Sequence, residues 1–392
     1  MKTINPDKIK KADIVVGIPS YCEEDTIAFV AEQASLGLKK YFPDKKSVII
    51  NVDNGSTDGT ESAFLNASLE TPRIYISTDK GIKGKGYNFY NLFWTIKELK
   101  AKAGIVLDAD LRSVRSNWIE KMGKPIFEDG YDFIAPYYMR SKTDATITNH
   151  LIYPLTYGLL GWDLRQPIGG DFAFSSKMVD LWIKDKWDPA VYEYGIDVFM
   201  SLTAFFENAK VGQVNLGSKI HNLSNPNLGP MFFQVTETFF KMISANLDKV
   251  KKTTKIQKPA LIGGNELPIL ANSDPLKEIF MKTFLDNLDF HWETIEKSVS
   301  SLVLNDLTKN YKSRTETISL ELWLKIVYDF LFAHKESNYS ADIIKALGCL
   351  YFGRVASFFN NNGKHTPEEI EEEIVKNDNY FFENRDYFLS KI

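Results

Sequence analysis

Short apolar runs in the first part of the chain each end at a polar loop. The runs span residues 14–19, 47–52, 74–76 and 103–107. Continuous apolar runs of this length are typical of buried parallel strands. Strand, loop and helix in alternation predict an α/β domain with a mostly parallel, Rossmann-like sheet. Ligands of such sheets bind outside the carboxyl ends of the strands, where these polar loops lie.

Helical patterns fill the spaces between the runs and dominate the end of the chain. Helices are expected over residues 27–41, 89–100, 117–127, 276–290, 320–334 and 340–359. Residues 251–264 are basic and then contain proline and glycine, which is typical of a linker. We therefore expect an α/β domain over residues 1–250, a linker over 251–273 and an all-helical C-terminal domain over 274–392. The helical domain would cover the site or form a homo-oligomer.

The composition is that of an ordinary globular protein and disfavours some functions. Of the 392 residues, 44% are hydrophobic and 25% are charged. The net charge of −4 argues against general binding of nucleic acid, which needs a basic face. No stretch approaches the roughly 20 apolar residues of a membrane helix, so we expect no membrane span and a cytoplasmic protein. Its two cysteines, Cys22 and Cys349, have no metal-ligand spacing.

Two carboxylates, Asp108 and Asp110, stand at the end of the fourth apolar run. Side chains alternate along a strand, so both are expected to project from one face. Neighbouring carboxylates repel each other unless a cation lies between them, and Mg²⁺ or Mn²⁺ binds such oxygens together with substrate phosphates. The pair therefore predicts a metal and diphosphate site. A pair that only caps the next turn is the alternative.

A loop with three glycines and three lysines, residues 80–88, precedes the third expected helix. Glycine allows close approach of the backbone, and a helix N-terminus favours an anion, so the loop predicts a phosphate contact. It lacks the ending of a Walker A loop and the third glycine of a dinucleotide fingerprint. A solvated basic turn is the alternative.

Four motifs follow one another in a characteristic order. They are Pro-Ser-Tyr-Cys-Glu-Glu-Asp-Thr-Ile (19–27), Asp-Asn-Gly-Ser-Thr-Asp-Gly-Thr (53–60), Lys-Gly-Lys-Gly (83–86) and Asp-Ala-Asp (108–110). This series resembles the nucleotide-sugar glycosyltransferases of the GT-A fold. Further segments resemble mannosylglycerate synthase and its relatives, the retaining enzymes that include glucosyl-3-phosphoglycerate synthases; they are residues 140–148, 166–171, 194–197 and 219–222. The similarity covers residues 12–245. Cys22 departs from the family, whose first loop usually carries asparagine.

The resemblance implies a donor site at the four motifs. Asp53 would accept a hydrogen bond from a nucleobase N–H, and Lys83 would offset charge on the leaving diphosphate. Asp108, Asp110 and His221 would hold a divalent metal, Mn²⁺ or Mg²⁺, which acts as a Lewis acid. The residues implied in donor binding are Pro19, Tyr21, Glu23, Asp53, Lys83, Asp108 and Ala109.

The resemblance also implies an acceptor site and a reacting centre. The implied catalytic residues are Asp197, Lys83 and Asp171. Asp171 would hold sugar hydroxyls, and Asp197 would orient or deprotonate the acceptor; a carboxylate that only caps a helix is the alternative for Asp197. The residues implied in acceptor binding are Arg140, Thr143, Asp144, Thr148, Gly169 and Gly170. An arginine fork suits a carboxylate, and threonine suits hydroxyl groups.

The implied reaction is a retaining, metal-dependent transfer of a hexose from GDP-mannose, UDP-glucose or GDP-glucose to a small hydroxy acid such as D-glycerate. A glucosyl-3-phosphoglycerate synthase is one alternative, although residues 157–161 lack the arginine and threonine of that branch's phosphate loop. An enzyme that extends a polysaccharide or a lipid-linked sugar is a second, disfavoured by the lack of a membrane segment. A sugar-nucleotide nucleotidyltransferase is a third, disfavoured because residues 19–26 are acidic rather than rich in glycine, arginine and lysine.

Overall fold

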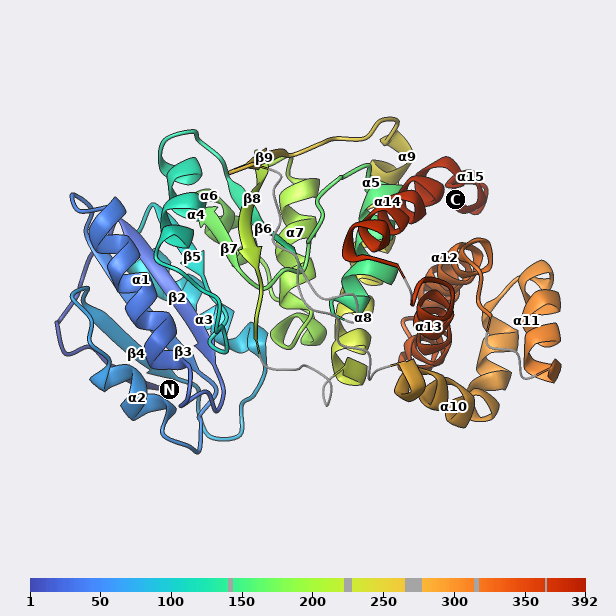
Figure 1. The fold of residues 1–392 in the computed structure, drawn as a ribbon, viewed down its shortest axis with the longest axis horizontal. Helices are drawn as coiled ribbons and strands as arrows, with labels where there is room; N and C mark the ends of the chain where they lie inside the picture. Colours follow the sequence, from blue (N-terminus) through green and yellow to red (C-terminus); the bar gives the residue numbers. More distant parts are fainter. Residues whose placement is uncertain (140–143, 222–227, 265–276, 314–316, 364) are drawn as a thin grey trace. The chain divides into compact units, whose positions relative to one another are not determined.

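The computed structural model describes residues 1–139, 144–221, 228–264, 277–313, 317–363 and 365–392 (Figure 1). Contacts divide the chain into two compact units. Unit 1 comprises residues 1–139, 164–225 and 259–268, and unit 2 comprises 140–163, 226–258 and 269–392. The sequence predicts an α/β domain over residues 1–250 and a helical domain over 274–392, joined by a linker over 251–273. The contacts instead group two earlier segments with the C-terminal helices, so the division is not continuous along the chain.

Unit 1 is built on one mixed sheet, in which the described strands follow the order β1-β4-β3-β2-β5-β7-β6-β8-β9. The strands are β1 (Lys2–Ile4), β2 (Ile14–Ser20), β3 (Ser47–Asp53), β4 (Arg73–Ser77), β5 (Ala103–Val106), β6 (Phe133–Met139), β7 (Phe172–Ser175), β8 (Val211–Ser218) and β9 (Ala260–Ile262). Strands β4, β3, β2 and β5 are mutually parallel, as are β6, β8 and β9. The prediction of a mostly parallel α/β sheet is confirmed.

The pairing of β7 explains why segments far apart in sequence meet at one edge of the sheet. β7 runs antiparallel to β5 and β6, and its first residue, Phe172, is paired with Val106 at the end of β5. The segment that enters β7 therefore lies beside the segment that leaves β5. Because β6 and β8 run in the direction of β5, the end of β8 reaches the same edge. This edge carries the loops after β2, β3, β5 and β8.

Helices cover both faces of the sheet. Those of unit 1 are α1 (Ile27–Tyr41), α2 (Thr60–Asn66), α3 (Lys85–Glu98), α4 (Asn117–Phe127), α6 (Ser176–Trp182), the 3-10 helix η2 (Pro189–Tyr192) and α7 (Ile196–Phe206). Side chains alternate along β2, so Ile14, Val16 and Ile18 share one buried cluster with α1 and α4. Gly17 faces the other way, and a Cβ there would lie 2.3 Å from Leu92 of α3. The sheet is thus the middle of three layers.

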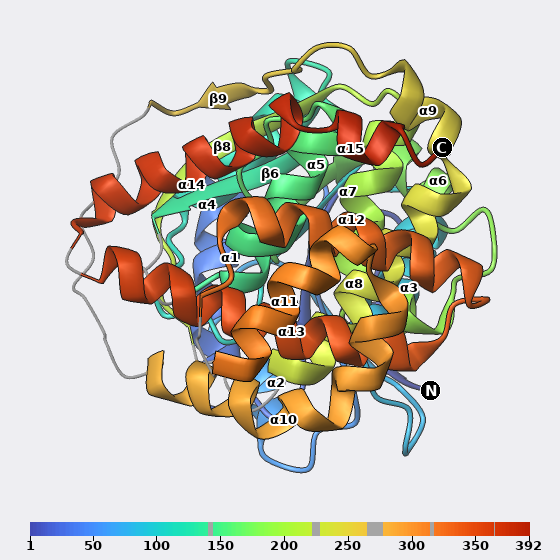
Figure 2. The same cartoon turned by 90° about the vertical axis from the view of Figure 1, so that its right-hand side faces the viewer.

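Unit 2 is helical in its described part. Its helices are the π-helix η1 (Thr148–Ile152), α5 (Tyr153–Leu160), α8 (Leu228–Ala245), α9 (Leu247–Lys252), α10 (Lys277–Ser298), α11 (Ser301–Ser313), α12 (Leu320–Glu336), α13 (Ala341–Asn362), α14 (Pro367–Glu383) and α15 (Asp386–Leu389). Helices α10 to α13 lie side by side (Figure 2). The indole N–H of Trp323 donates to the carbonyl of His150 at 2.7 Å, and the Arg385 guanidinium donates to the carbonyls of Thr253 and Val250. These bonds tie the earlier segments to the C-terminal helices, and the predicted all-helical C-terminal region is confirmed.

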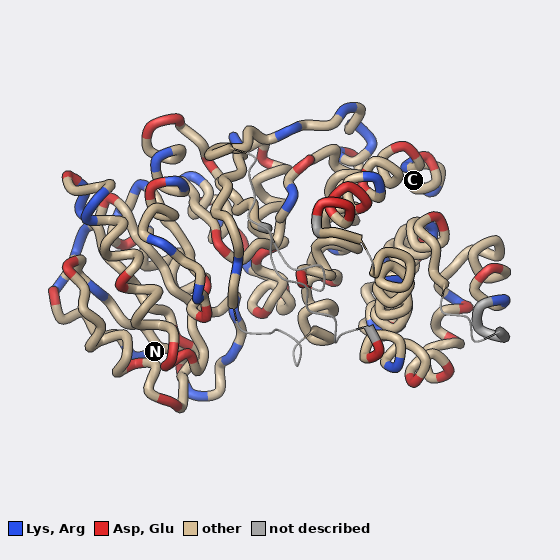
Figure 3. Tube along the Cα trace, viewed as in Figure 1, with Lys and Arg blue, Asp and Glu red and all other residues tan. Residues whose placement is uncertain are grey.

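The charged residues are distributed along both units. Lysines and arginines alternate with acidic residues along most of the chain, and the acidic run 368–373 stands out in α14 (Figure 3). Thr366 caps that helix in a capping box with Glu369, as its sequence indicates. None of the helices in the described part of the chain is long and apolar enough to span a membrane.

Candidate active site

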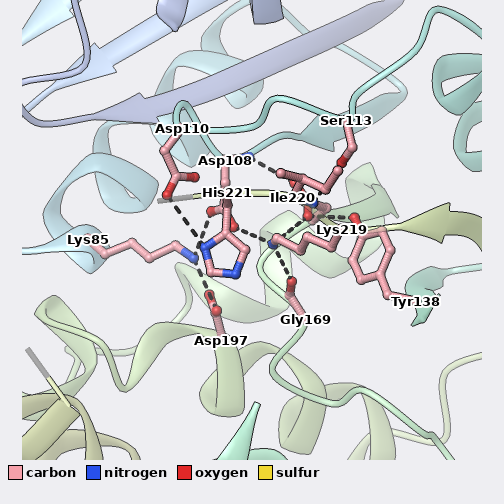
Figure 4. Close-up of polar contacts among 11 residues, drawn as sticks. Lys85, Asp108, Asp110, Ser113, Tyr138, Gly169, Asp197, Lys219, Ile220 and His221 are labelled. Atoms are coloured by element: carbon pink, nitrogen blue, oxygen red, sulfur yellow. Dashed lines mark hydrogen bonds and ion pairs between the residues drawn. The ribbon is translucent and has the colours of Figure 1, made fainter. Parts of the chain in front are cut away.

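Carboxylates and ammonium groups from five separate segments meet at the carboxyl edge of the sheet in unit 1 (Figure 4). Asp108 and Asp110 follow β5, and Lys219 and His221 follow β8. Lys85 is the first residue of α3, Asp171 precedes β7, and Asp197 lies in the first turn of α7. The strand directions described above therefore bring these residues together.

Asp108 is held by two lysines. One carboxylate oxygen, Oδ1, lies 3.1 Å from the ammonium of Lys85, and Oδ2 lies 2.7 Å from that of Lys219. Burial alone would raise the pKa of Asp108, but the two ammonium groups outweigh it and hold that pKa far below its usual range. Asp108 is therefore an ionised group compensated by the protein's own cations.

Asp171 is a buried carboxylate that accepts hydrogen bonds from several neighbouring groups of this cluster. Its Oδ1 accepts the backbone N–H of Asp108 at 2.8 Å, and its Oδ2 accepts the hydroxyl of Tyr138 at 2.6 Å and the ammonium of Lys219 at 2.8 Å. Burial raises its pKa, and Lys219 opposes that rise. The family resemblance implies that Asp171 contacts sugar hydroxyls, yet its side chain is 0% exposed and both of its oxygens accept hydrogen bonds within the protein. Asp171 thus hydrogen-bonds the backbone of Asp108 and the ammonium of Lys219, and its predicted contact with sugar hydroxyls stays a prediction.

Asp197 lies at the start of α7, where a carboxylate is favoured by the helix dipole. Its Oδ2 is 3.1 Å from the ammonium of Lys85, and its Oδ1 is buried without a hydrogen-bond partner among the described residues. Burial raises the pKa of Asp197, and Lys85 opposes that rise. A buried acceptor atom without a donor is costly, so this oxygen is suited to a donor supplied by a ligand.

Asp110 and His221 form a separate pair. Nδ1 of His221 lies 3.7 Å from Oδ2 of Asp110, and both side chains are partly exposed. Two bonds hold this geometry, since Arg112 N–H donates to the carbonyl of Ile220 and Ile220 N–H donates to Ser113 Oγ, each at 2.9 Å. Two ligands of one Mg²⁺, each at about 2.1 Å, have donor atoms no more than about 4 Å apart. The 3.7 Å separation of this pair lies within that limit.

The predicted three-ligand metal set differs from the observed arrangement. In the described part of the chain, no group of three or more His, Cys, Asp or Glu side chains is placed to hold a metal. Both oxygens of Asp108 face lysines, so Asp108 stands apart from Asp110 and His221. The reason is that β5 ends at Val106 and a turn follows, so strand alternation does not extend to residues 108 and 110.

The predicted diphosphate lysine, Lys83, lies outside this cluster. Its ammonium donates to the hydroxyl of Tyr21 at 2.5 Å and stands 4.4 Å from the centre of that ring. Tyr21 is 41% exposed, so the two predicted donor-binding residues share one open surface. The lysine of this loop that lies among the carboxylates is Lys85, two residues later.

Asp53 has a different environment from the one predicted. It is 1% exposed, and its two oxygens accept four hydrogen bonds, from Ser20 Oγ, Ser56 N–H, Ser56 Oγ and Tyr75 Oη. Four donors fill the capacity of a carboxylate. Asp53 therefore fixes the loop after β3, and this arrangement leaves no oxygen lone pair for the nucleobase contact that the sequence predicts.

Glu23 lies in the loop after β2 and faces the acidic residues after β5. Its Oε2 accepts the hydroxyl of Thr26 at 3.3 Å, and burial, with the nearby charge of Asp110, raises its pKa to about 7. Two further predicted donor-binding residues are buried. Pro19 lies near the end of β2, and Ala109 lies in the turn after β5. They contribute backbone rather than exposed side chains to this edge.

The glycines before Asp171 allow close backbone approach. Gly170 has φ +88°, and a Cβ there would lie 2.3 Å from Oδ2 of Asp108. The carbonyl of Gly169 accepts the ammonium of Lys219 at 2.9 Å. These contacts bind the protein's own groups, so the predicted role of both glycines in acceptor binding stays a prediction.

The remaining predicted acceptor residues lie elsewhere in the chain. Arg140 and Thr143 lie outside the described residues. Asp144 and Thr148 belong to unit 2, where Thr148 is buried at the start of η1 and Asp144 Oδ1 accepts the N–H of Ala145. Their role in acceptor binding stays a prediction.

Three residues of the cluster are not among the site residues predicted from the sequence: Lys85, Lys219 and Tyr138. The signal for Lys85 was available, because it lies in the lysine and glycine loop, but spacing does not say which lysine turns inward. Lys219 is two residues before His221. Tyr138 carries no local signal, since it is one aromatic residue of a strand.

The comparisons with known proteins identify the family. The family model described as "Mannosylglycerate synthase, GT domain" matches residues 40–244, more than half of the chain. The chain belongs to this family. It is therefore a glycosyltransferase, and the mostly parallel sheet of unit 1 is the GT-A fold expected for the family. No curated protein matches the chain.

Solved structures that match the chain include several of glucosyl-3-phosphoglycerate synthase from Mycobacterium tuberculosis. Its complex with Mg²⁺ and uridine diphosphate is 22% identical, covers 59% of this chain and 80% of that chain, and has a TM-score of 0.48. Its complex with Mn²⁺, UDP-glucose and phosphoglyceric acid is 21% identical with the same coverage and a TM-score of 0.47. A mycobacterial protein is 20% identical, covers 67% and 80%, and has a TM-score of 0.47.

At Cys22 this member of the mannosylglycerate synthase family carries cysteine where the family usually carries asparagine. The φ of Cys22 is +57°, in the left-handed region, and its N–H donates to Ser56 Oγ at 2.7 Å. Asparagine adopts this conformation more readily than other residues with a side chain. The asparagine usual at this place therefore has a conformational reason, and cysteine here holds the same turn under strain.

Proposed function

We propose that this enzyme transfers a hexose, with retention of configuration, from a nucleotide-sugar to a small hydroxy acid such as D-glycerate. The donor is GDP-mannose, UDP-glucose or GDP-glucose, and a divalent metal, Mn²⁺ or Mg²⁺, takes part. Membership of the mannosylglycerate synthase family supports the reaction class. The residues described above support the assignment of the reacting centre.

The proposal depends chiefly on the burial and the hydrogen-bond partners of the Asp197 carboxylate. This carboxylate is buried, Lys85 holds one oxygen, and the other oxygen has no partner among the described residues. An acceptor hydroxyl would supply the missing donor. Because burial raises the pKa of Asp197, its carboxylate is a better proton acceptor than an exposed aspartate.

The donor half of the site lies on the other side of Asp108. Asp110 and His221 would hold the metal, with the donor's phosphates as further ligands, an arrangement that Mg²⁺ often adopts. When bound, the metal supplies Lewis-acid charge for the leaving diphosphate. Tyr21 and Lys83 would contact the nucleotide or its phosphates from the exposed edge.

In the transfer step the bond from the sugar's C1 to the diphosphate oxygen breaks, and the acceptor oxygen bonds to C1 on the same face. Asp197 Oδ1 accepts a hydrogen bond from the acceptor hydroxyl and receives its proton as the new bond forms. The diphosphate leaves with the electron pair of the broken bond. Asp108 and Asp171 take no part in bond making; they fix the backbone and the charges around this position.

An acceptor without a phosphate group is favoured by residues 157–161. In the phosphoglycerate branch this position carries a phosphate loop, whereas here it is the buried end of α5. The hydroxyl of Tyr157 bonds to Asn379 at 2.7 Å, and a Cβ on Gly158 would lie 2.8 Å from Phe381. A segment packed on α14 in this way offers no phosphate-binding loop.

The test is a panel of sugar nucleotides and three-carbon acceptors with Mn²⁺, read by the mass of the product. We expect transfer to D-glycerate to exceed transfer to 3-phosphoglycerate, and Asp197→Asn to abolish it. Asp180→Asn is the matched control, because Asp180 is an exposed carboxylate that pairs with Lys97. Absence of product from every donor would refute the proposed function. A homo-oligomer formed by the helical domain and a cytoplasmic location stay predictions.

A further inference from the structure

Lys85 is a partly buried cation of the reacting centre that contacts two of its carboxylates. It is the only lysine or arginine of the described residues whose ammonium forms ion pairs with both Asp108 and Asp197, at 3.1 Å each. Its side chain is 17% exposed, compared with 50% for Lys97 on the same helix. Burial lowers the pKa of an ammonium group, but here the two carboxylates outweigh burial and raise it.

The backbone around Lys85 is locked in place by its two glycine neighbours. Gly84 has φ +138°, and its carbonyl accepts the side-chain amide of Asn54 at 3.0 Å. Gly86 N–H donates to the carbonyl of Glu193 at 3.0 Å, and a Cβ on Gly86 would lie 1.9 Å from the carbonyl of Val191. The start of α3 is thus fixed against the segment that leads into α7. A lysine at this position can reach only a narrow region, which contains Asp197.

Asp108 and Asp197 differ in the number of lysines that form ion pairs with them. Asp108 is paired with Lys219 as well as Lys85, whereas Asp197 has only Lys85 as an ion-pair partner among the described residues. Loss of Lys85 would therefore leave Asp108 with one buried cation and Asp197 with none. An uncompensated buried carboxylate turns toward solvent or takes up a proton.

We propose that Lys85 is a positioning residue of the transfer reaction: its ammonium holds Oδ2 of Asp197, so that Oδ1 faces the acceptor hydroxyl, and ties that carboxylate to Asp108 on the donor side. The proposal rests on the proposed function. It assigns Lys85, rather than the exposed Lys83, as the loop lysine that serves the reacting centre. The bridge joins the acceptor side of the site to the donor side without a metal.

The first test separates orientation of the acceptor from general damage. Donor hydrolysis by water and transfer to D-glycerate are measured for wild type, Lys85→Met and Lys85→Arg. A misplacement of about 1 Å in a reacting group can cost about 100-fold in rate, so we expect transfer by Lys85→Met to fall about 100-fold. Hydrolysis needs no oriented acceptor and should fall by less than about 10-fold, while the arginine variant recovers part of the transfer.

Lys97→Met is the matched control, because Lys97 lies on the same helix and forms an exposed ion pair with Asp180. It should leave both rates unchanged. A merely structural role of Lys85 would lower hydrolysis and transfer by the same factor. Equal losses, or transfer by Lys85→Met within threefold of wild type, would overturn the proposal.

The second test does not depend on catalysis. Melting temperatures are compared for wild type, Lys85→Met, Asp197→Asn and the double variant. Because Lys85→Met leaves Asp197 charged and unpaired, adding Asp197→Asn should raise the melting temperature of Lys85→Met rather than lower it further. Additive losses would overturn the bridge. If the wild type transfers no sugar, the proposed function and the positioning role of Lys85 fail together, and this cycle still decides whether the ion pair exists.

Discussion

Replacement of Lys219 by methionine should destabilise unit 1 strongly. Lys219 is 6% exposed, and its ammonium donates to Asp108, Asp171 and the carbonyl of Gly169 at 2.7 to 2.9 Å. Methionine keeps the apolar stem but removes the charge. Asp171 then has no ion-pair partner among the described residues, and Asp108 keeps only Lys85.

The size of the effect follows from the burial of these groups. Removal of one partner from a buried ion pair costs about 3–5 kcal/mol, because the other charge stays behind uncompensated. Whole proteins are stable by only about 5–15 kcal/mol, so this loss is a large fraction of the total. An exposed pair such as Lys97 with Asp180 is worth about 0–1 kcal/mol. Lys97→Met is therefore the control, with an expected loss near zero.

Urea denaturation followed by circular dichroism measures both variants against wild type. We expect a much lower midpoint for Lys219→Met, and partial recovery when Asp171→Asn is added. The loss should shrink as the pH falls, because burial already raises the pKa of Asp171 and protonation removes the uncompensated charge. If Lys219→Met denatures at the same urea concentration as Lys97→Met, the charge cluster does not stabilise the fold as argued.

Three further predictions concern the loops around the cluster. The folded-state pKa of Glu23 is about 7, above its ordinary 4.5, so its contribution to stability is present below pH 4.5 and lost as the pH rises through 7. The melting temperature of Glu23→Gln relative to that of wild type should therefore rise between pH 5 and 8. A difference in melting temperature that does not change with pH would contradict this. Cys22→Asn should raise stability by about 0.5–1 kcal/mol because asparagine tolerates φ +57° better, and a loss in urea denaturation would argue against strain at Cys22. Asp110→Asn and His221→Ala should each weaken Mn²⁺ binding at least tenfold in calorimetry without sugar nucleotide, whereas unchanged affinity would place the metal elsewhere.

The sequence predicted local elements well because their signals are local. The helices expected over 27–41 and 117–127 have those bounds in the structure, and the first four apolar runs are strands. The start of α3 is the informative exception: it begins at Lys85, four residues before the expected position 89. Contacts of Gly84 and Gly86 with residues 191–193 determine this start, and no pattern within the helix reports them.

The candidate site was predicted in its location but not in its pairings. Carboxyl ends of strands at one edge follow from the α/β pattern, and Asp108, Asp110, Asp197 and His221 all lie there. Which cation faces which carboxylate depends on contacts across 112 residues, as for Lys85 and Asp197, and residue spacing does not encode them. For the same reason the sequence could not show that protein donors fill the hydrogen-bonding capacity of Asp53.

The charged residues of the site fall into two groups: carboxylates paired with the protein's own lysines, and residues proposed to hold a metal. Three aspartates, Asp108, Asp171 and Asp197, are compensated by Lys85 and Lys219, so the protein's own cations balance part of their charge. Asp110 and His221 lie 3.7 Å apart and are the residues proposed above to hold a metal. A donor that arrives with its own phosphates and a divalent ion then adds nearly balanced charge beside a centre that is already ordered. Preorganised charge of this kind lowers the reorganisation needed as charge develops on a leaving diphosphate.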